Sequence, residues 1–465
     1  MLRRLVPVCL LSAALWNACA RPQPPHVLLI VVDAWRADRV DFYDTGRQLT
    51  PFLTSLAARG TVFWRAYAQT SWTMPSVASL WTSRYPSQHG VTSFSSVLPD
   101  TERTLAEAFR AHGYATAAFS ANPMLAKPGL ERGFERQDRP GHGRKHQKES
   151  AAHLSRRGLI WLDGRPPGTP VFLYLHYMEP HFPYLPPREA LERLLSRRQD
   201  PEPERRALAD MLFEHRRDWK HPDAVMADLL HDLYDAEVLS LDAQLKRFFS
   251  ALGKRGFLRN AIVVITADHG EELLDHGGIG HGGTLYNEVI RIPLLMLVPG
   301  QAARVDVSSV VSEVDIAPTL LDLAGIPAPT PFEGHSLRGV VRRARRPWPG
   351  LDWMPALLGW RDHGAYAYSE LLSLPNGGTP RRQVRSVVVG SEKLMVDASA
   401  KQEIYDLDSD PHETAPEDLP ASDRLALQQA LELARQRATR NVSAAHTERL
   451  DPRTRERMRM LGYGT

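Results

Sequence analysis

The sequence predicts an α/β protein: a mostly parallel sheet sandwiched by helices, followed by a smaller antiparallel sheet and a helix near the C-terminus. The first observation is a set of unbroken apolar runs, which are typical of strands buried on both faces. These runs cover residues 26–32, 114–121, 171–177, 261–267 and 293–298. The second observation is that helical segments alternate with them, as in parallel sheets covered by helices. The third is a series of short β-like segments suited to an antiparallel sheet, at 366–371, 385–389, 393–396 and 403–407.

The predicted helices have recognisable beginnings and ends. Residues 50–59 begin with Pro51, whose missing amide hydrogen costs nothing in a first turn, and they stop before Gly60. Residues 234–253 form a longer amphipathic helix with apolar positions at helical spacing. Further helices are expected at 101–112 and around 314–321.

Composition indicates a large globular chain with a leader. The chain has 465 residues, of which 43% are hydrophobic and 24% charged, enough for a large core and two domains. The net charge of +3 gives no reason to expect nucleic acid as a partner. Residues 1–20 combine Arg3 and Arg4 with a short apolar run and a small-residue end, the pattern of a secretory signal.

The leader predicts export, with two forms left open. Cleavage after Ala20 gives a periplasmic or extracellular protein, whereas lipidation of Cys19 gives a bacterial lipoprotein attached to the membrane. Cys9 and Cys19 are the two cysteines of the sequence. The exported body therefore has no disulfide and no catalytic thiol.

Residues 71–91, SWTMPSVASLWTSRYPSQHGV, contain the first candidate for chemistry. Pro75 and the small residues after it predict a helix that starts beside Thr73. A hydroxyl at the partly positive end of a helix is well placed to meet an anion. The alternative is that Thr73 only caps the helix.

Polar side chains follow the apolar runs where the predicted strands end. Asp33 follows the run at 26–32, and Asp268, His269, Gly270 and Glu271 follow the run at 261–267. The carboxyl ends of parallel strands form the ligand-binding edge of such a sheet. A carboxylate and an imidazole at this edge can reach one cation.

Two further histidine segments lie after predicted strands. His181 stands in the sequence EPHFPY just beyond the run at 171–177, and His276 and His281 lie in a glycine-rich turn. Their places soon after strand ends favour a functional role for His181 and for the glycine-rich histidine turn over a purely structural one. His176, inside its run, is interpreted as a buried core histidine.

These motifs together resemble the sulfatase branch of the alkaline phosphatase superfamily. The resemblance runs from His26 to the end of the chain and is weakest at 129–165 and 186–232. It rests on the residues of the signature segment, the DxxRxD after the first strand, the HGxxxHGxxLY segment, the DIAPTLLDLAGIP segment and the YDLDSDPHE segment. The signature residues are Thr73, Pro75, Leu80, Thr82, Arg84, Tyr85, Pro86, His89 and Gly90.

The resemblance implies an alkaline-phosphatase-like fold and one metal site. Its ligands would be Asp33, Thr73, Asp268 and His269, with His181 and His281 beside the ester. Calcium is the metal that the family implies, and the imidazole of His269 also suits manganese or zinc. Glu288 and Arg291 are expected to pair and hold the loop, and Arg36 either contacts an anion or pairs with Asp38.

Three departures from the family pattern bear on the reaction. Thr73 stands where the family has a Cys or Ser that is oxidised to formylglycine, and Val77 stands where it has Arg. The family often has two adjacent Asp where this chain has Asp33 alone. Oxidation of threonine would give a ketone, because its β-carbon carries a methyl group. We therefore expect Thr73 to be an unmodified nucleophile.

The predicted function is hydrolysis of a sulfate, phosphate or phosphonate ester, with phosphorus favoured because of Thr73. The substrate would be a small-molecule, glycan or lipid-linked ester. One alternative is a phosphotransferase resembling lipoteichoic acid synthase and the phosphoethanolamine transferases. The other is a non-catalytic binding protein that kept the fold.

The predicted organisation places a main domain at 26–340, with a helical insertion of mixed charge at about 186–232, and a C-terminal subdomain at 360–465. A basic, proline-containing linker is expected at 338–349. The basic, glycine-rich segment at 129–157 is interpreted as a loop beside the site.

Overall fold

The computed structural model describes residues 23–138, 149–196, 224–345, 366–372, 383–444, 446–448 and 452. The leader at 1–20, most of the expected insertion and the end of the expected linker lie outside these residues. Among the described helices, none is both long enough and apolar enough to span a bilayer.

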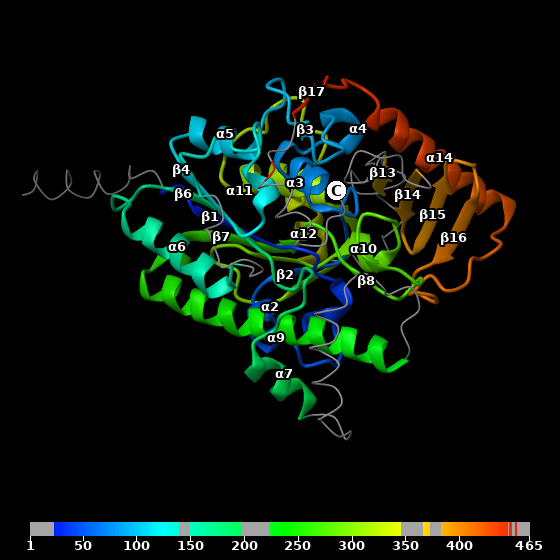
Figure 1. Cartoon of the computed structure of the whole chain (residues 1–465). Coiled ribbons are helices and arrows are strands. Elements are labelled where there is room, and N and C mark those ends of the chain that lie inside the picture. The colour runs from blue at the N-terminus through cyan, green and yellow to red at the C-terminus, as the bar shows by residue number, and fades with distance from the viewer. Residues whose placement is uncertain are drawn as a thin grey trace, which may run out of the picture.

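A nine-stranded sheet forms the centre of the fold (Figure 1). Its strand order is β10-β2-β11-β7-β1-β6-β4-β5, with β12 paired to β2. Parallel pairing joins β7, β1, β6, β4 and β5 and joins β12 to β2, whereas β10 and β11 run antiparallel to their neighbours. The expectation of a mostly parallel sheet is confirmed. The strands are β1 His26–Val32, β2 Thr61–Tyr67, β4 Ala115–Ser120, β5 Arg136–Asp138, β6 Val171–Tyr177, β7 Ala261–Ala267, β10 Arg291–Ile292, β11 Leu294–Leu297 and β12 Val305–Ser312.

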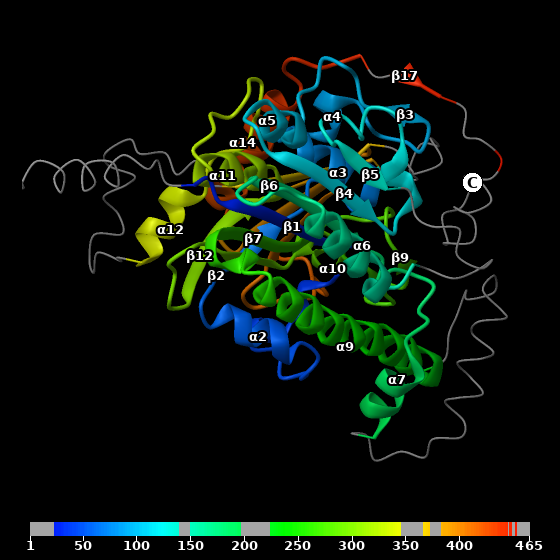
Figure 2. The same cartoon turned by 90° about the vertical axis from the view of Figure 1, so that its left-hand side faces the viewer.

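Helices cover both faces of this sheet (Figure 2). One layer contains α2 Pro51–Ala57, α6 Ala151–Asp163 and α9 Ala224–Lys254, with α7 Arg188–Leu195 packed on α9. The other contains α3 Thr73–Thr82, α5 Leu105–Ala111 and α11 Ile316–Leu323. Every residue of β6 and β7 is buried, as strands covered on both faces must be.

Short elements complete the main body. They are the 3-10 helices η1 Ala37–Arg39, η2 Asp41–Tyr43, η3 Pro123–Ala126, η4 Phe257–Asn260 and η5 Glu313–Asp315; the helices α4 Pro86–His89, α10 Asn287–Ile290 and α12 Arg338–Arg345; and the strands β3 Ser96–Val97, β8 Glu272–Leu273, β9 Ile279–Gly280 and β17 His446–Thr447.

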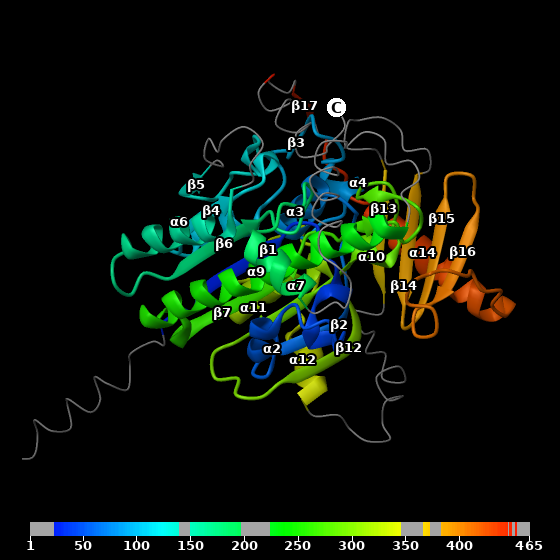
Figure 3. The same cartoon turned by 60° about the horizontal axis from the view of Figure 1, so that its bottom comes forward.

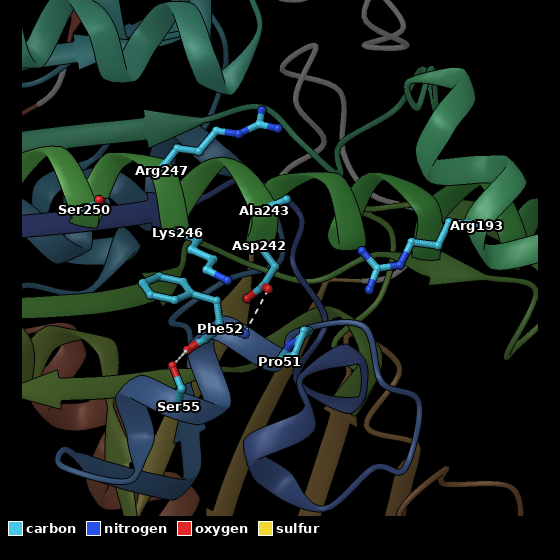
Figure 4. Close-up of a pocket in the computed structure, with 9 residues that line it drawn as sticks. All are labelled: Pro51, Phe52, Ser55, Arg193, Asp242, Ala243, Lys246, Arg247 and Ser250. Carbon is cyan, nitrogen blue, oxygen red and sulfur yellow. Dashed lines mark hydrogen bonds between the residues drawn. The ribbon is translucent and has the colours of Figure 1, made fainter.

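Helix α2 is capped by a distant residue. Its N-cap residue Thr50 makes no side-chain cap, but Asp242 of α9 accepts hydrogen bonds from the amides of Phe52 and Leu53, both at 3.0 Å. Burial raises the pKa of Asp242 to about 6. Asp242 lines a cavity of about 690 Å³ between α2, α7 and α9 (Figure 4). The two hydrogen bonds to Asp242 therefore join the start of α2 to α9.

A second, four-stranded antiparallel sheet lies beside the main sheet, with α14 Ala421–Ala438 packed against it (Figure 3). Its strands are β13 Ala367–Leu371, β14 Val384–Val389, β15 Glu392–Asp397 and β16 Gln402–Asp406. The small C-terminal sheet and helix are therefore confirmed. The amide of Glu370 donates to the carbonyl of Gln69 at 2.9 Å, which joins β13 to the segment that leads into α3.

Three sequence-based expectations were wrong in part. The segment at 129–157 contains β5 and the start of α6, whose apolar face packs on β4 and β6. The end of the expected insertion belongs to α9, which is one helix of 31 residues starting at Ala224. Arg338–Arg345 is a helix, because Val340 and Val341 pack against the core.

The replacement of Gly270 by alanine is expected to destabilise the fold. A β-carbon at Gly270 would lie 1.9 Å from the carbonyl oxygen of Glu288, so the two segments would have to separate. We expect Gly270→Ala to cost about 1–3 kcal/mol, the usual range for overpacking. The midpoint of denaturant unfolding measures this cost.

Gly253→Ala is the control for that substitution. A β-carbon at Gly253, inside α9, meets no atom within 4 Å. Alanine is favoured over glycine in a helix by about 1 kcal/mol, so this variant should be at least as stable as the wild type. Equal stability of the two variants would show that the close approach at Gly270 does not constrain the loop.

Candidate metal centre and active site

Adjacent strand ends bring the predicted ligands together. Strand β1 lies between β7 and β6, and Val32 at its end is in register with Ala267 and Tyr177. Asp33 and Asp268 are the next residues of β1 and β7, so both emerge at the carboxyl edge of the sheet. Thr73 lies at the same edge. It is the first residue of α3, whereas the sequence predicted that it would lie just before the helix.

The four side chains predicted as ligands converge around His269 and Thr73. The Thr73 hydroxyl oxygen lies 3.4 Å from Asp33 Oδ1 and 3.2 Å from His269 Nε2. His269 Nε2 also lies 3.5 Å from Asp33 Oδ1 and 3.5 Å from Asp268 Oδ2. All four residues are fully buried.

Each carboxylate has one oxygen held by donors and one directed at this point. Asp268 Oδ1 accepts from the amides of Ala34 and His269, whereas Oδ2 accepts no hydrogen bond from the described residues. Asp33 Oδ2 accepts from Asn122 Nδ2 at 2.7 Å and lies 3.0 Å from His176 Nε2. Asp33 Oδ1 is left to face Thr73 and His269.

The hydrogen bonds fix the tautomer of His269. Its Nδ1 lies 2.8 Å from the carbonyl oxygen of Gly270, which can only accept, so Nδ1 carries the proton. Burial, and then the neighbouring His281, lowers the pKa of His269 well below its ordinary value. The ring is therefore neutral, and the lone pair of Nε2 faces the oxygens of Asp33 and Asp268.

Oxygen and nitrogen lone pairs that face one another in a buried site call for a cation between them. Burial, then Asp33 and Glu313, raises the pKa of Asp268 well above its ordinary value. Burial alone would raise the pKa of Asp33 too, but His181, His176 and His269 lower it. Carboxylate, hydroxyl and imidazole donors fit a divalent metal ion, so the donor set agrees with a metal site.

His176 contributes to this site, which the sequence interpretation as a core histidine missed. It is fully buried as expected, but Asp33, His176 and Asp268 each offer one atom within 4.8 Å of the others. The hydroxyl of Tyr174 lies 2.8 Å from His176 Nδ1 and can donate to it, which leaves Nε2–H to donate to Asp33. In this arrangement His176 holds one oxygen of the Asp33 carboxylate in place.

Asn122 and Glu271 were also missed as site residues. Asn122 follows β4 and Glu271 follows the Asp268-His269-Gly270 sequence, so their positions after strands were the available signal. An asparagine or a glutamate after a strand does not by itself indicate a functional site, because its contact partner is not visible in the sequence.

His181 and His281 lie beside the four converging side chains. The ring centre of His281 is 4.4 Å from that of His269 and 4.9 Å from that of His181. His281 Nδ1 lies 2.8 Å from Glu271 Oε1 and donates to it. Burial lowers the pKa of His281, but Glu271 outweighs burial and raises it above the ordinary value. This shift favours the protonated ring of His281, which can donate a proton.

The loop that carries His281 is attached to the C-terminal sheet. His276 Nδ1 lies 2.7 Å from Glu288 Oε1, and Nε2 lies 3.1 Å from the carbonyl oxygen of Glu413. The His276 ring stacks on Tyr286 with ring centres 3.5 Å apart. The expected pair of Glu288 and Arg291 is wrong: Glu288 binds His276, and Arg291 donates to the carbonyl of Trp64.

Arg36 pairs with carboxylates. It is 2% exposed and binds Asp38 at 2.8 Å and Asp275 at 2.6 Å. It also donates to the carbonyl of Glu271 at 3.0 Å. Of the two expected roles, the structure supports pairing, which fixes the segment next to Asp33.

Comparisons with known proteins agree with this fold. The sequence family described as Sulfatase matches residues 25–326, and the family described as N-sulphoglucosamine sulphohydrolase, C-terminal, matches residues 281–418. The chain belongs to the sulfatase family, within the alkaline phosphatase superfamily. The family is metal-dependent, which agrees with the group of potential ligands at the strand ends.

Curated relatives include arylsulfatase K of Bos taurus, 29% identical over 365 residues, a match that covers 68% of this chain and 66% of the relative. The N-acetylglucosamine-6-O-sulfatase of Bacteroides thetaiotaomicron is 24% identical over 439 residues, covering 76% of this chain and 77% of the relative. The chain thus spans just under two thirds of the arylsulfatase K length.

Solved structures share the fold. A protein in complex with its substrate D-glucosamine-2-N,6-O-disulfate superposes with a TM-score of 0.73 at 20% identity, covering 90% of this chain and 99% of the other. The phosphonate monoester hydrolase of Agrobacterium radiobacter gives a TM-score of 0.70 at 21% identity, covering 92% and 100%.

The His276 contact is expected to make stability depend on pH. Glu288 outweighs the effect of burial and raises the pKa of His276 to about 9. Because this pKa is above that of an unfolded histidine, the stabilisation is complete below about pH 6.5 and is lost as the pH rises through about 9. The His276 side chain is 16% exposed and therefore partly screened by solvent, so we expect a stabilisation of about 1 kcal/mol.

Unfolding of wild type and His276→Gln at pH 6 and pH 10 measures this dependence. The variant should be less stable than the wild type at pH 6 and nearly equal to it at pH 10. A difference that is the same at both pH values would contradict a charged His276.

Proposed function

We propose that the protein is a metal-dependent hydrolase of esters of phosphorus or sulfur oxyanions, with Thr73 as an unmodified nucleophile and a preference for phosphorus. The observation that carries the proposal is the convergence of the Thr73 hydroxyl, Asp33 Oδ1, Asp268 Oδ2 and His269 Nε2 at one buried point. Family membership supports ester hydrolysis as the reaction class.

Asp33, Thr73, Asp268 and His269 would hold one divalent metal, with Asn122 and His176 orienting Asp33. When bound, the metal lowers the pKa of a coordinated hydroxyl and withdraws electrons from a non-bridging ester oxygen. Calcium is the choice that the family resemblance implies. The neutral imidazole of His269 also suits manganese or zinc.

The remaining residues account for binding and proton transfer. The Thr73 oxygen forms a bond to phosphorus or sulfur while the bond to the leaving oxygen breaks. His281, protonated through Glu271, gives its proton to that leaving oxygen, and His181 binds the ester beside it. The partly positive start of α3 stabilises the negative charge on the non-bridging oxygens of the ester group. The proton that the Thr73 hydroxyl loses in this step goes to solvent. Water then attacks the phosphorus or sulfur of the Thr73 ester and gives a proton to His281, which is neutral after the first step. The bond to the Thr73 oxygen breaks, the acid is released, and Thr73 regains its proton from solvent.

The presence of Thr73 as nucleophile supports phosphorus esters over sulfate esters as substrates. A formylglycine hydrate expels sulfate by returning to the aldehyde, and a threonine ester has no such route, so water must cleave it. The names of the structural relatives include both a sulfated sugar and a phosphonate monoester as substrates, so both classes belong in a test.

The nucleophile is tested with an aryl sulfate, a phosphate monoester, a phosphate diester and a phosphonate monoester, each with Ca²⁺, Mn²⁺ or Zn²⁺. We expect the highest kcat/KM on a phosphorus ester, a loss of about 10³-fold or more in Thr73→Ala, and about tenfold or less in Thr73→Ser, which keeps the hydroxyl. Chelation should abolish turnover of the wild type.

Other results would reject this assignment. Full activity of Thr73→Ala would exclude Thr73 as nucleophile. Turnover that requires an alcohol acceptor instead of water would indicate a phosphotransferase, and no turnover with any ester and metal would indicate a binding protein.

Glu271→Gln tests the proton donor. Without the carboxylate the pKa of His281 falls, so the decline of kcat at high pH should begin at lower pH, with kcat reduced about 10–100-fold. Glu272→Gln is the matched control, because Glu272 contacts the amides of Gly278 and His276 and not His281. An unchanged pH profile in Glu271→Gln would exclude His281 as the acid.

A further inference from the structure

Helix α3 carries a second hydroxyl close to the site, that of Ser76. Thr73 and Ser76 are three residues apart, so their side chains share one face of the helix. The Ser76 hydroxyl oxygen lies 2.6 Å from the carbonyl oxygen of Asp268 and 2.9 Å from each carboxyl oxygen of Glu313. Both Ser76 and Glu313 are fully buried.

A count of hydrogens decides the state of Glu313. Ser76 has one hydroxyl hydrogen, but its oxygen lies at hydrogen-bond distance both from the Asp268 carbonyl oxygen and from the Glu313 carboxyl oxygens. Each of these two contacts needs a hydrogen. One hydrogen cannot serve both. The conflict disappears if Glu313 is protonated, because its O–H then donates to the Ser76 oxygen and the Ser76 O–H donates to the Asp268 carbonyl.

The surroundings of Glu313 agree with this count. Within the described part of the chain, no Lys, Arg or His forms a salt bridge with Glu313. Burial raises the pKa of Glu313 well above its ordinary value, although the contact with Ser76 and the Gln69 amide act in the opposite direction. A neutral acid is therefore the stable form at this place.

We propose that Glu313 is a positioning residue that works as a neutral hydrogen-bond donor, ordering the chain Glu313 to Ser76 to the Asp268 carbonyl. The chain joins the first turn of α3, which carries Thr73, to the peptide between Asp268 and His269. It thereby fixes the hydroxyl of Thr73 relative to two of the predicted metal ligands. This inference rests on the proposed function of Thr73.

A second contact holds the far end of the same helix. Ser83, which follows α3, donates to the carbonyl of Val314 at 2.6 Å, and Val314 is the residue after Glu313. The amide of Val314 donates to Gln69 Oε1 at 3.0 Å, and Gln69 lies in the segment that leads into α3. The 3-10 helix η5 thus binds α3 at both ends, with Glu313 at the end near the site.

The variant Glu313→Gln distinguishes a protonated, neutral Glu313 from an ionised one. The amide of glutamine can donate to Ser76 as the protonated acid does, so we expect the dissociation constant for Mn²⁺, measured by calorimetry, and kcat to stay within about threefold of the wild type. If Glu313 were an anion, its removal would take a negative charge from beside the cation site. A tenfold or larger loss of Mn²⁺ affinity in Glu313→Gln would overturn the proposal.

Infrared spectroscopy tests the protonation state independently of activity. The wild type should show the carbonyl band of a buried carboxylic acid that is absent from Glu313→Gln. Absence of that band from the difference spectrum would also overturn the proposal. If no ester is hydrolysed, the proposed function fails while the spectrum still decides the state of Glu313.

Ser76→Ala tests the positioning itself. The Asp268 carbonyl then loses its donor and Glu313 loses its acceptor, so we expect kcat to fall about tenfold with KM nearly unchanged. Asp33→Asn serves as the positive control for lost Mn²⁺ binding. Wild-type kcat in a folded Ser76→Ala variant would show that the chain does not position Thr73.

Discussion

Two carboxylates, Asp33 and Asp268, are forced together at the carboxyl edge of the sheet, and the site depends on how their charge is balanced. At about 4 Å and an effective dielectric constant of about 20, two like charges repel by about 4 kcal/mol. The protein does not relieve this by protonating His269, because burial and the neighbouring His281 lower the pKa of that ring. A cation held by Asp33, Asp268 and His269 would relieve it, with the Thr73 hydroxyl as a further ligand.

The surrounding structure holds each donor in one orientation. Asn122 and His176 bind one oxygen of Asp33, and the amides of Ala34 and His269 bind one oxygen of Asp268. More distant parts hold the helix and loop that carry the remaining groups. Lys393 in β15 binds Glu413 at 2.7 Å, and the Glu413 carbonyl accepts from His276, so the C-terminal sheet supports the loop of His281. This explains how a small sheet far along the chain contributes to the site.

Much of the fold and of the predicted site followed from local patterns. Apolar runs at 171–177 and 261–267 coincide with β6 and β7, and the residues expected as ligands lie just after β1 and β7 or at the start of α3. Strand order could not be predicted, yet the site needs β1 between β7 and β6. The role of His176 depends on that order, because its ring reaches Asp33 only across the β1–β6 pair. The partners of Glu288 and Glu313 likewise come from contacts between remote segments that no local pattern shows.

The central claim is that one cation binds where the donors of Asp33, Thr73, Asp268 and His269 meet. A crystal grown with Mn²⁺ and examined by anomalous diffraction measures this directly. The account predicts a single strong anomalous peak within coordination distance of Asp33 Oδ1, Asp268 Oδ2, His269 Nε2 and the Thr73 oxygen. A peak coordinated by other residues, or no peak at this point at saturating Mn²⁺, would contradict it.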